Sequence, residues 1–360
     1  NLGFGTADGQ ITQNSSGTLT IGGVISGSGN VNILGSGTVS LSGPNTFGGA
    51  SKSLQVGSSI LILTGDANLG DAANTLSCNG TVLQTADGFT TSRAISVLSG
   101  GVTWDIASGW TSTLNGALSG AGGLTKRSAG TLVLGGNSSY TGTTTIMAGT
   151  TTVTHANGLG STAGGTRVDN GASLILDSIA VGAEAVTLIG AGVGSNGVLQ
   201  GVGTSSCSGA ITLTGESTIG GTGNALTLSG TLSGNFHLSK AGTGSLTLGG
   251  ANSGYIYRLA FIDGSSGKII AAHNNALGSY AGLTVISGDI LELSSASIPS
   301  GKTLTIAGNG GGATVGALRF TGAGCGWAGP MTLSAATTIG GTGSGTISGV
   351  ISGAFNLTKC

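Results

Sequence analysis

The sequence predicts an all-β protein wound as a parallel β-solenoid, and three observations lead to this fold class. Glycine supplies 75 of the 360 residues, whereas only 6% of the residues are charged. Short segments such as Leu246-Thr-Leu248 alternate apolar residues with serine or threonine, which is the pattern of strands that bury one face. Similar segments return along the chain, and stacked repeats bury their apolar faces against one another.

The repeat is defined by four copies of one opening segment, a five-residue run that begins and ends with glycine and has serine in fourth place. These copies are Gly23–Gly27, Gly116–Gly120, Gly230–Gly234 and Gly349–Gly353. We therefore expect one continuous solenoid over 1–360. Its super-repeats would cover about 23–115, 116–229 and 230–348, and a fourth would start at 349–360.

Each super-repeat contains several short strands of period two, separated by glycines. Their inward apolar pairs are expected at Leu19/Ile21, Val39/Leu41, Ile95/Val97, Leu132/Leu134, Val186/Leu188, Ile211/Leu213, Leu246/Leu248, Leu304/Ile306 and Leu318/Phe320. Helix is expected only in short stretches near Asp66–Ala73. An antiparallel sandwich is the alternative, but it needs many tight hairpin turns, and Asn-Gly dipeptides are few.

A coil of about 20–25 residues, a usual size for repeat folds, gives roughly 15–18 coils. With adjacent strands about 4.8 Å apart, the expected single elongated rod is about 70–85 Å long.

A formal net charge of −1 excludes the basic surface of a nucleic-acid-binding protein. No apolar run approaches the roughly 20 residues of a membrane helix, so no membrane span is expected. The chain starts at Asn1 without a signal-peptide pattern, which indicates a processed protein or a fragment.

Residues 124–150 carry a specific resemblance to a known family. They read Leu-Thr-Lys-Arg-Ser-Ala-Gly-Thr-Leu-Val-Leu-Gly-Gly-Asn-Ser-Ser-Tyr-Thr-Gly and continue with a threonine-rich strand. This segment resembles the autotransporter-associated β-strand repeat, also called the passenger-associated transport repeat. His155–Ser161 is similar to the Asn-Ala-Leu-Gly element of that family, and His273–Ser279 repeats it. In Tyr255–Gly264, an aromatic stretch replaces the threonine-rich strand.

The resemblance implies a right-handed parallel β-helix that is secreted or displayed on a bacterial surface. It implies no catalytic residues. The residues themselves agree, because the twelve carboxylates are scattered rather than clustered as in β-helix lyases and glycosidases. Asp289 and Glu292 are the closest distinct pair, but their odd separation puts them on opposite faces of a strand. We expect no catalytic, cofactor-binding or metal-binding residue.

Three further groups of polar residues are assigned to turns, corners or the surface. Asp66–Asp71 is compatible with a calcium loop, but a turn held by Asx side chains is the favoured interpretation. The histidines at 155, 237 and 273 are assigned to turns or the surface rather than to a metal. Lys126, Lys240 and Lys359 share one repeat position and are expected at solvated corners.

The aromatic residues and cysteines are assigned mainly to the core. Trp104, Trp110 and Trp327 would fill the core or cap corners, with a sugar-binding platform as the alternative. Cys78, Cys207 and Cys325 fit buried thiols, and their spacings match no zinc or redox motif.

The end of the sequence suggests a junction. Phe355 and Leu357 are expected to face inward in an ordinary, uncapped coil, and Cys360 is the candidate for an intermolecular disulfide. The partners would be copies of this chain, head to tail or lateral, or the rest of a longer chain.

The sequence therefore predicts a non-enzymatic, extracellular structural protein, a rod or filament subunit that stacks end to end. The alternative is an adhesin passenger segment that presents a region for binding a glycan or another receptor on a host surface.

Overall fold

The computed structural model describes residues 1–221, 223, 225–261, 267–285, 287–312 and 315–360. It confirms the predicted fold class, because it is all-β and its parallel strands form a β-solenoid of about 16 turns. The chain contains two compact units, Asn1–Leu174 and Ile175–Cys360, with strand β21 (Ala172–Asp177) at the boundary. The division into super-repeats stays a prediction.

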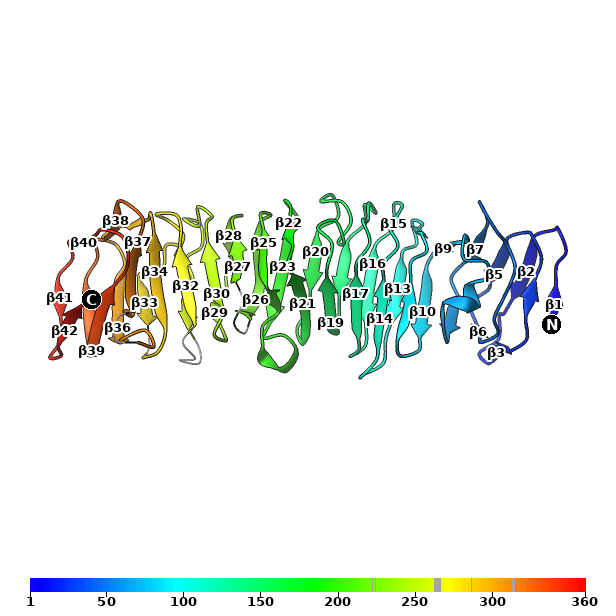
Figure 1. Cartoon of the computed structure of the whole chain (residues 1–360), viewed down its shortest axis with the longest axis horizontal. Helices are drawn as coiled ribbons and strands as arrows, with labels where there is room; N and C mark the ends of the chain where they lie inside the picture. Colours follow the sequence, from blue (N-terminus) through cyan, green and yellow to red (C-terminus); the bar gives the residue numbers. More distant parts are fainter. Residues whose placement is uncertain (222, 224, 262–266, 286, 313–314) are drawn as a thin grey trace. The chain divides into compact units, whose positions relative to one another are not determined.

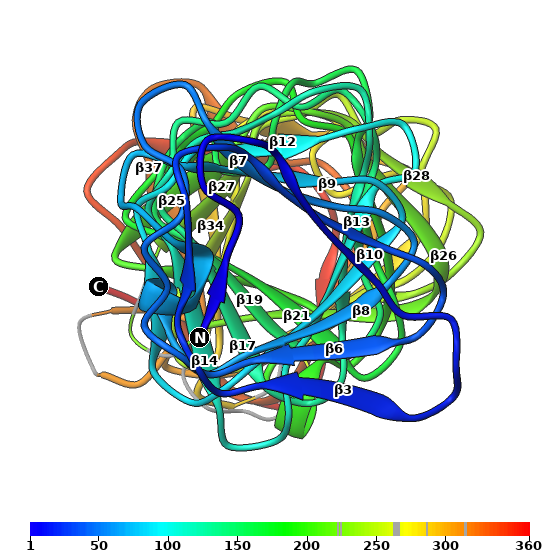
Figure 2. The same cartoon turned by 90° about the vertical axis from the view of Figure 1, so that its right-hand side faces the viewer.

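In the first unit a turn contains two or three strands, and the strands of successive turns pair in parallel to form ladders (Figure 1). One ladder contains β2 (Gly9–Thr12), β5 (Val31–Leu34), β7 (Ser53–Val56), β9 (Thr75–Cys78), β12 (Ile95–Val97) and β15 (Leu118–Ser119). A second contains β3 (Thr18–Ile21), β6 (Thr38–Leu41), β8 (Ile60–Leu63), β10 (Thr81–Thr85), β13 (Val102–Asp105), β16 (Leu124–Arg127), β18 (Thr144–Ile146) and β20 (Thr166–Val168). The third side comprises the pair β1 (Leu2–Gly3) and β4 (Ile25–Ser26) and the ladder of β11 (Phe89–Thr91), β14 (Thr111–Leu114), β17 (Thr131–Leu134) and β19 (Gly149–Val153). Figure 2 shows β3, β6 and β8 on one side of these turns and β7, β9 and β12 on another.

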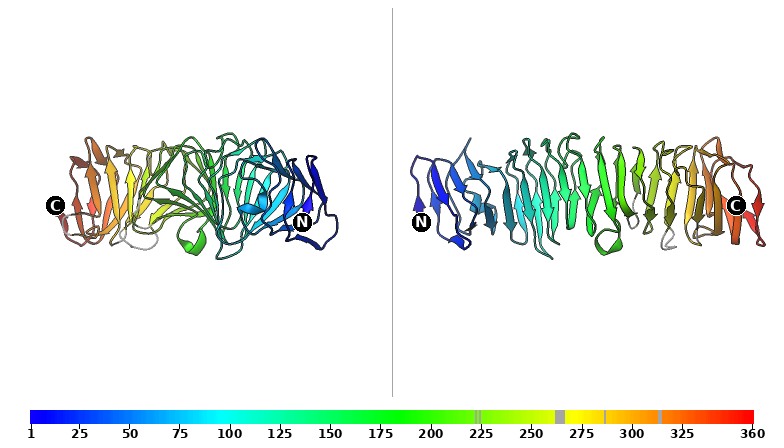
Figure 3. Two further views of the ribbon diagram at one scale, coloured as in Figure 1. Left: turned by 45° about the vertical axis from the view of Figure 1, so that its right-hand side comes forward. Right: turned by 180° about the vertical axis from the view of Figure 1, so that it is seen from behind.

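The second unit contains parallel ladders of the same kind, which Figure 3 shows from two further directions. Its main ladder contains β22 (Ala180–Val181), β25 (Thr204–Cys207), β27 (Ala225–Leu228), β30 (Ser245–Leu248), β32 (Lys268–Ala271), β34 (Ile290–Ser294), β37 (Leu318–Thr321) and β39 (Met331–Gly340). Others contain β23 (Val186–Gly190), β24 (Leu199–Val202), β26 (Ile211–Gly220), β28 (Leu232–Gly234), β29 (Leu238–Lys240) and β31 (Leu259–Phe261). The remaining strands are β33 (Gly282–Val285), β35 (Ser297–Ile298), β36 (Thr303–Gly308), β38 (Cys325–Trp327), β40 (Gly345–Ile347), β41 (Ile351–Ser352) and β42 (Leu357–Lys359).

The pairing register confirms the expected coil size. Val31 pairs with Leu54, and Leu54 pairs with Leu76, which lie 23 and 22 residues further along the chain. Helical structure among the described residues is limited to two 3₁₀ turns, η1 (Asp66–Leu69) and η2 (Val193–Ser195). The first lies in the stretch where the sequence predicted a short helix. Within the described ranges, no helix is long and apolar enough to cross a membrane.

Stacked apolar side chains form the core of each unit, as the alternation predicts, but the expectation is wrong for Leu19, which is 37% exposed on β3. Leu134 pairs with Leu114 on one side and Val153 on the other, and all three are buried. In the second unit, Leu246 pairs with Leu226 and Ile269 in the same way, and these are buried as well. Leu132 and Leu248 are also buried, so the predicted inward face of both segments is confirmed.

A buried aromatic residue supports a glycine-containing loop in three places. Tyr140 is buried, and its carbonyl oxygen accepts a hydrogen bond from the backbone N–H of Ser161, 2.9 Å away. Gly160 has a φ of +84°, and a Cβ atom there would lie 2.6 Å from the same carbonyl oxygen, so glycine is required. Equivalent bonds join Asp71 to Phe47 and Ser279 to Tyr255. The Asp66–Asp71 loop is therefore a further copy of the elements at 155–161 and 273–279.

Candidate binding groove

Lys126 is one of the buried polar residues of the first unit. Lys126 lies on β16 in an inward position between Trp104 and Ile146 and is only 1% exposed. Its Nζ atom donates hydrogen bonds to the carbonyl oxygens of Arg127 (3.0 Å), Ser128 (2.7 Å) and Ala148 (3.2 Å). Burial lowers the pKa of Lys126 to about 8, although the negative charge of Asp105 partly offsets this effect.

The expectation that these lysines are solvated corner residues is therefore wrong for two of them. Lys240 is 2% exposed, and its Nζ atom donates to the carbonyl oxygens of Ala241 (2.7 Å) and Gly242 (2.6 Å). At each of these corners, carbonyl oxygens point inward and need a donor, which the long lysine side chain supplies from the core. Lys359 is exposed and bonds to the carbonyl oxygen of Cys360.

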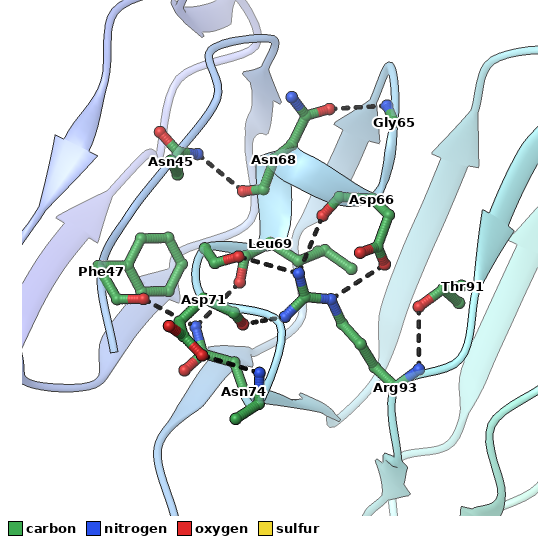
Figure 4. Close-up of polar contacts among 12 residues, drawn as sticks. Asn45, Phe47, Gly65, Asp66, Asn68, Leu69, Asp71, Asn74, Thr91 and Arg93 are labelled. Atoms are coloured by element: carbon green, nitrogen blue, oxygen red, sulfur yellow. Dashed lines mark hydrogen bonds and ion pairs between the residues drawn. The ribbon is translucent and has the colours of Figure 1, made fainter. Parts of the chain in front are cut away.

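The guanidinium group of Arg93, which lies between β11 and β12, binds the Asp66–Asp71 loop (Figure 4). Nε of Arg93 lies 2.9 Å from Oδ1 of Asp66, and its terminal nitrogens donate to the carbonyl oxygens of Asp66, Gly70 and Asp71. Asn68 Oδ1 accepts from the backbone N–H groups of Thr64 and Gly65. The prediction of a turn held by Asx side chains is confirmed, because Asp71 Oδ1 also accepts from the backbone N–H of Ala73, at 2.9 Å.

A groove of about 440 Å³ opens on the outer side of the first unit, where β8, β10 and β13 end. We call it the Trp110 groove, and its lining includes Ile62, Thr64, Gln84, Asp105, Trp110 and Ser128. Trp110 is held in a turn between two backbone bonds, its own N–H to Ala107 (3.1 Å) and its carbonyl oxygen to Thr131 (2.8 Å). Trp110 is 42% exposed. An accessible aromatic face therefore lies beside polar side chains.

The polar side of the groove is organised around Asp105. Oδ2 of Asp105 accepts from Gln84 Nε2 (3.1 Å) and from a terminal nitrogen of Arg127 (2.7 Å), while Oδ1 accepts from the hydroxyl of Ser128. Burial alone would raise the pKa of Asp105, but these hydrogen bonds and the charge of Arg127 lower it to about 2. The carboxylate is therefore fixed in position and stays an acceptor.

The three tryptophans do not share one role. Trp104 and Trp327 are buried in the core, as expected. Trp110 is exposed at the groove, so the core interpretation fails for this residue and the platform interpretation remains open. The turn that contains Trp110 also contains Gly109 at a φ of +81°, a backbone conformation that glycine adopts readily.

The other candidate residues are separated by the fold. Asp289 is buried and accepts from the backbone N–H of Gly267 at 3.1 Å. Glu292 instead lies between Lys268 (3.2 Å) and Arg319 (3.4 Å) on neighbouring strands. In these contacts, the two carboxylates are bound by different groups.

The histidines at 155 and 273 serve as turn residues, as predicted. Nδ1 of each accepts from the backbone N–H two residues later, at 3.1 Å for Asn157 and 3.0 Å for Asn275. His237 stacks edge-on against Tyr257, with 6.0 Å between the ring centroids. Ile262 to Gly264 of the aromatic stretch lie outside the described residues. Among the residues that the structure does describe, no three His, Cys, Asp or Glu side chains gather at one point.

The cysteines fall into two groups. Cys78, Cys207 and Cys325 are buried thiols, as expected, and Cys360 is exposed. Burial raises the pKa of Cys78 to about 12. In the last turn Phe355 is 50% exposed and Leu357 is 43% exposed. The proposed junction of these two residues with Cys360 stays a prediction.

Comparison with known proteins identifies the repeated segments. The family model described as the passenger-associated-transport-repeat matches residues 124–153 and 238–256. Two segments of the chain are therefore similar to the passenger-associated transport repeat. Each matched repeat contains one of the buried lysines, Lys126 or Lys240, and one of the buried tyrosines, Tyr140 or Tyr255.

A curated relative covers more of the chain. Over 266 residues, the chain is 32% identical to the protein named adhesin BmaC autotransporter of Brucella suis biovar 1 (strain 1330). The aligned region is 68% of this chain and 7% of the relative, so the chain spans a small fraction of that protein's length. No solved structure matches this chain significantly.

Sequence reasoning missed the role of Arg93. The sequence does contain a signal, because Arg93, Glu184 and Lys302 each come just before an apolar strand. In the structure all three residues are buried. A glycine one turn later stacks closely on each of these positions. A Cβ atom at Gly116 would collide with the carbonyl oxygen of Arg93, and a Cβ atom at Gly329 with that of Lys302. Lys302 donates to the carbonyl oxygen of Tyr280 (2.5 Å), beside the third loop, as Arg93 does beside the first. The charge differs between copies, which hides the position in a sequence comparison.

Proposed function

We propose that this chain is a non-enzymatic, extracellular segment of an autotransporter passenger and that its solenoid presents an adhesive surface. The observation that carries the proposal is the presence of two passenger-associated transport repeats within a region similar to an autotransporter adhesin. Such a segment is secreted or displayed at the bacterial cell surface. The parallel β-solenoid suits this role, because stacked turns provide a long series of outward strands on which binding residues can be placed.

The placement of the carboxylates supports a role without catalysis. Asp66, Asp105 and Asp169 are each paired with an arginine, and Glu292 lies between two cations. All of these pairs except Asp169–Arg167 join residues of neighbouring turns. General acid–base chemistry instead needs a group whose proton is exchanged with a bound substrate.

A structural subunit that associates with further copies is the second candidate. The exposed thiol of Cys360 and the exposed side chains of Phe355 and Leu357 favour it, because together they offer an apolar contact and a covalent link. The partner in this case is another copy of the chain rather than a host surface.

The experiment that distinguishes these candidates uses the purified chain in two forms. Latex beads coated with the chain are counted on cultured epithelial cells, and free chain is examined by light scattering and negative-stain electron microscopy. Beads carrying the chain are expected to bind more cells than beads carrying a Leu246→Asp variant whose core is disrupted. Equal bead counts would contradict the adhesive role, and concentration-dependent polymers would support the structural one.

A further inference from the structure

The Trp110 groove has the features of a preformed small-ligand site. Its volume of about 440 Å³ lies within the range of about 300–1,000 Å³ that is usual for such sites. One wall is apolar and comprises Ile62 and the indole of Trp110, while Gln84, Asp105 and Ser128 supply the polar side. This combination of an aromatic surface with a few fixed polar groups sets the orientation of a bound ligand.

The polar side is held before any ligand arrives. Gln84 and Asp105 are register partners on β10 and β13, and Asp105 pairs with Arg127 on β16. Three hydrogen bonds to the Asp105 carboxylate fix its plane. A carboxylate has about four acceptor positions, so it retains capacity for a hydroxyl donor from a ligand. Because these groups sit on strands rather than on a loop, binding costs little side-chain ordering.

The charge of the lining selects among ligand classes. Of the described residues that line the groove, Asp105 is the one that carries a charge at neutral pH. The lining therefore offers no cation to an anionic ligand, since Arg127 is bound to Asp105 outside it. A peptide would require a row of unpaired backbone groups along a strand edge, but β8, β10 and β13 are paired with one another.

We propose that the Trp110 groove binds a neutral saccharide, with one sugar ring packed on the indole of Trp110 and sugar hydroxyls bonded to Asp105 and Gln84. The C–H groups of a pyranose face carry partial positive charge and fit the negative face of an aromatic ring. The hydroxyls of the same ring can donate hydrogen bonds to the carboxylate of Asp105. They can also accept hydrogen bonds from hydroxyl and amide side chains. The proposal rests on the proposed adhesive function, for which it names the recognised chemistry.

The test measures binding of the intact purified chain to defined oligosaccharides by isothermal titration calorimetry. The neutral probes are lactose, cellobiose, mannobiose and chitobiose, and the charged probe is sialyllactose. At least one neutral probe is expected to bind, and Trp110→Ala is expected to weaken that binding at least tenfold. Trp110→Phe, which keeps an aromatic face, should lose less affinity than Trp110→Ala.

Met147→Ala is the matched control, because Met147 is also a large exposed apolar residue of the first unit, 48% exposed, but does not line the groove. It is expected to leave the affinity unchanged. The proposal is overturned if no neutral probe binds, if Trp110→Ala binds as tightly as the original chain, or if only sialyllactose binds.

The bead assay separates this proposal from the proposed function. One outcome is that the chain binds no saccharide while beads coated with Trp110→Ala still bind cells fully. This outcome would overturn the groove proposal and leave the adhesive role standing. Saccharide binding that depends on Trp110, with no adhesion of coated beads, would overturn the adhesive role instead.

Discussion

The ammonium group of Lys126 lies 2.7 Å from the carbonyl oxygen of Ser128, and the hydroxyl of Ser128 in turn donates to Asp105 in the Trp110 groove. A core residue thus holds the corner from which the polar side of the groove is built. The corner needs this support because Ser128 has a φ of +65°, a backbone conformation that is costly for residues other than glycine.

Replacement of Lys126 is expected to change how stability depends on pH. Burial lowers the pKa of Lys126 to about 8 in the folded chain, from 10.5 in the unfolded chain. Between these values the unfolded chain binds a proton that the folded chain does not, so stability rises with pH through this window. After allowance for solvent screening near the corner, the gain is about 1–2 kcal/mol.

The measurement compares urea unfolding of the original chain and Lys126→Met at pH 7, 8.5 and 10. The difference in unfolding free energy between the two proteins should widen as the pH rises, since the methionine variant lacks the titrating group. Lys302 has a lowered pKa as well but is present in both proteins, so its contribution cancels. Parallel pH profiles would show that Lys126 titrates at its ordinary pKa.

The core assignment of Leu246 predicts a large loss of stability on substitution by aspartate. Leu246 is buried between Leu226 and Ile269, so a charge at this position would be left without a partner. The expected cost is about 3–5 kcal/mol, from the lost apolar contacts and the unpaired charge. Thr247→Asp is the control, because Thr247 lies on the alternate, less buried face of β30. Thermal unfolding followed by circular dichroism measures both, and similar melting temperatures would refute the assigned face.

Removal of the Arg93 side chain is expected to loosen the Asp66–Asp71 loop. Arg93→Met leaves Asp66 and the carbonyl oxygens of Gly70 and Asp71 without their donor, at a cost of about 2–3 kcal/mol. Arg167→Met is the matched control, since the Arg167 side chain is 61% exposed and its pair with Asp169 is worth about 0–1 kcal/mol. Hydrogen exchange of the amides at 65–74 should accelerate in the first variant only. Unchanged exchange in Arg93→Met would show that the loop does not depend on the guanidinium group.

The sequence predicts the repeating framework well because each turn follows simple local rules. Alternation determines which leucines face inward, and the glycine at 160 marks a corner that only glycine fits without strain. The buried cations were not predictable in this way. Lys126 and Arg93 are placed by the carbonyl oxygens of neighbouring corners, and composition alone assigns charged residues to the surface. For Trp110 the sequence left core filling, corner capping and a sugar-binding platform open, because a sequence does not show on which side of a corner an aromatic ring projects.

The thiols provide a last prediction, which tests the junction at Cys360. Cys78, Cys207 and Cys325 are buried, and burial raises the pKa values of Cys78 and Cys207, so these thiols should react slowly in the folded chain. Native titration with a thiol reagent is expected to modify one cysteine per chain quickly, and all four after unfolding. If Cys360 links copies, oxidation of the chain should yield a dimer on non-reducing gels. The Cys360→Ser variant should form no such dimer, whereas the Cys325→Ser variant should still form it. A dimer that persists in Cys360→Ser would assign the link to another cysteine, and a chain that stays monomeric after oxidation would contradict the proposed junction.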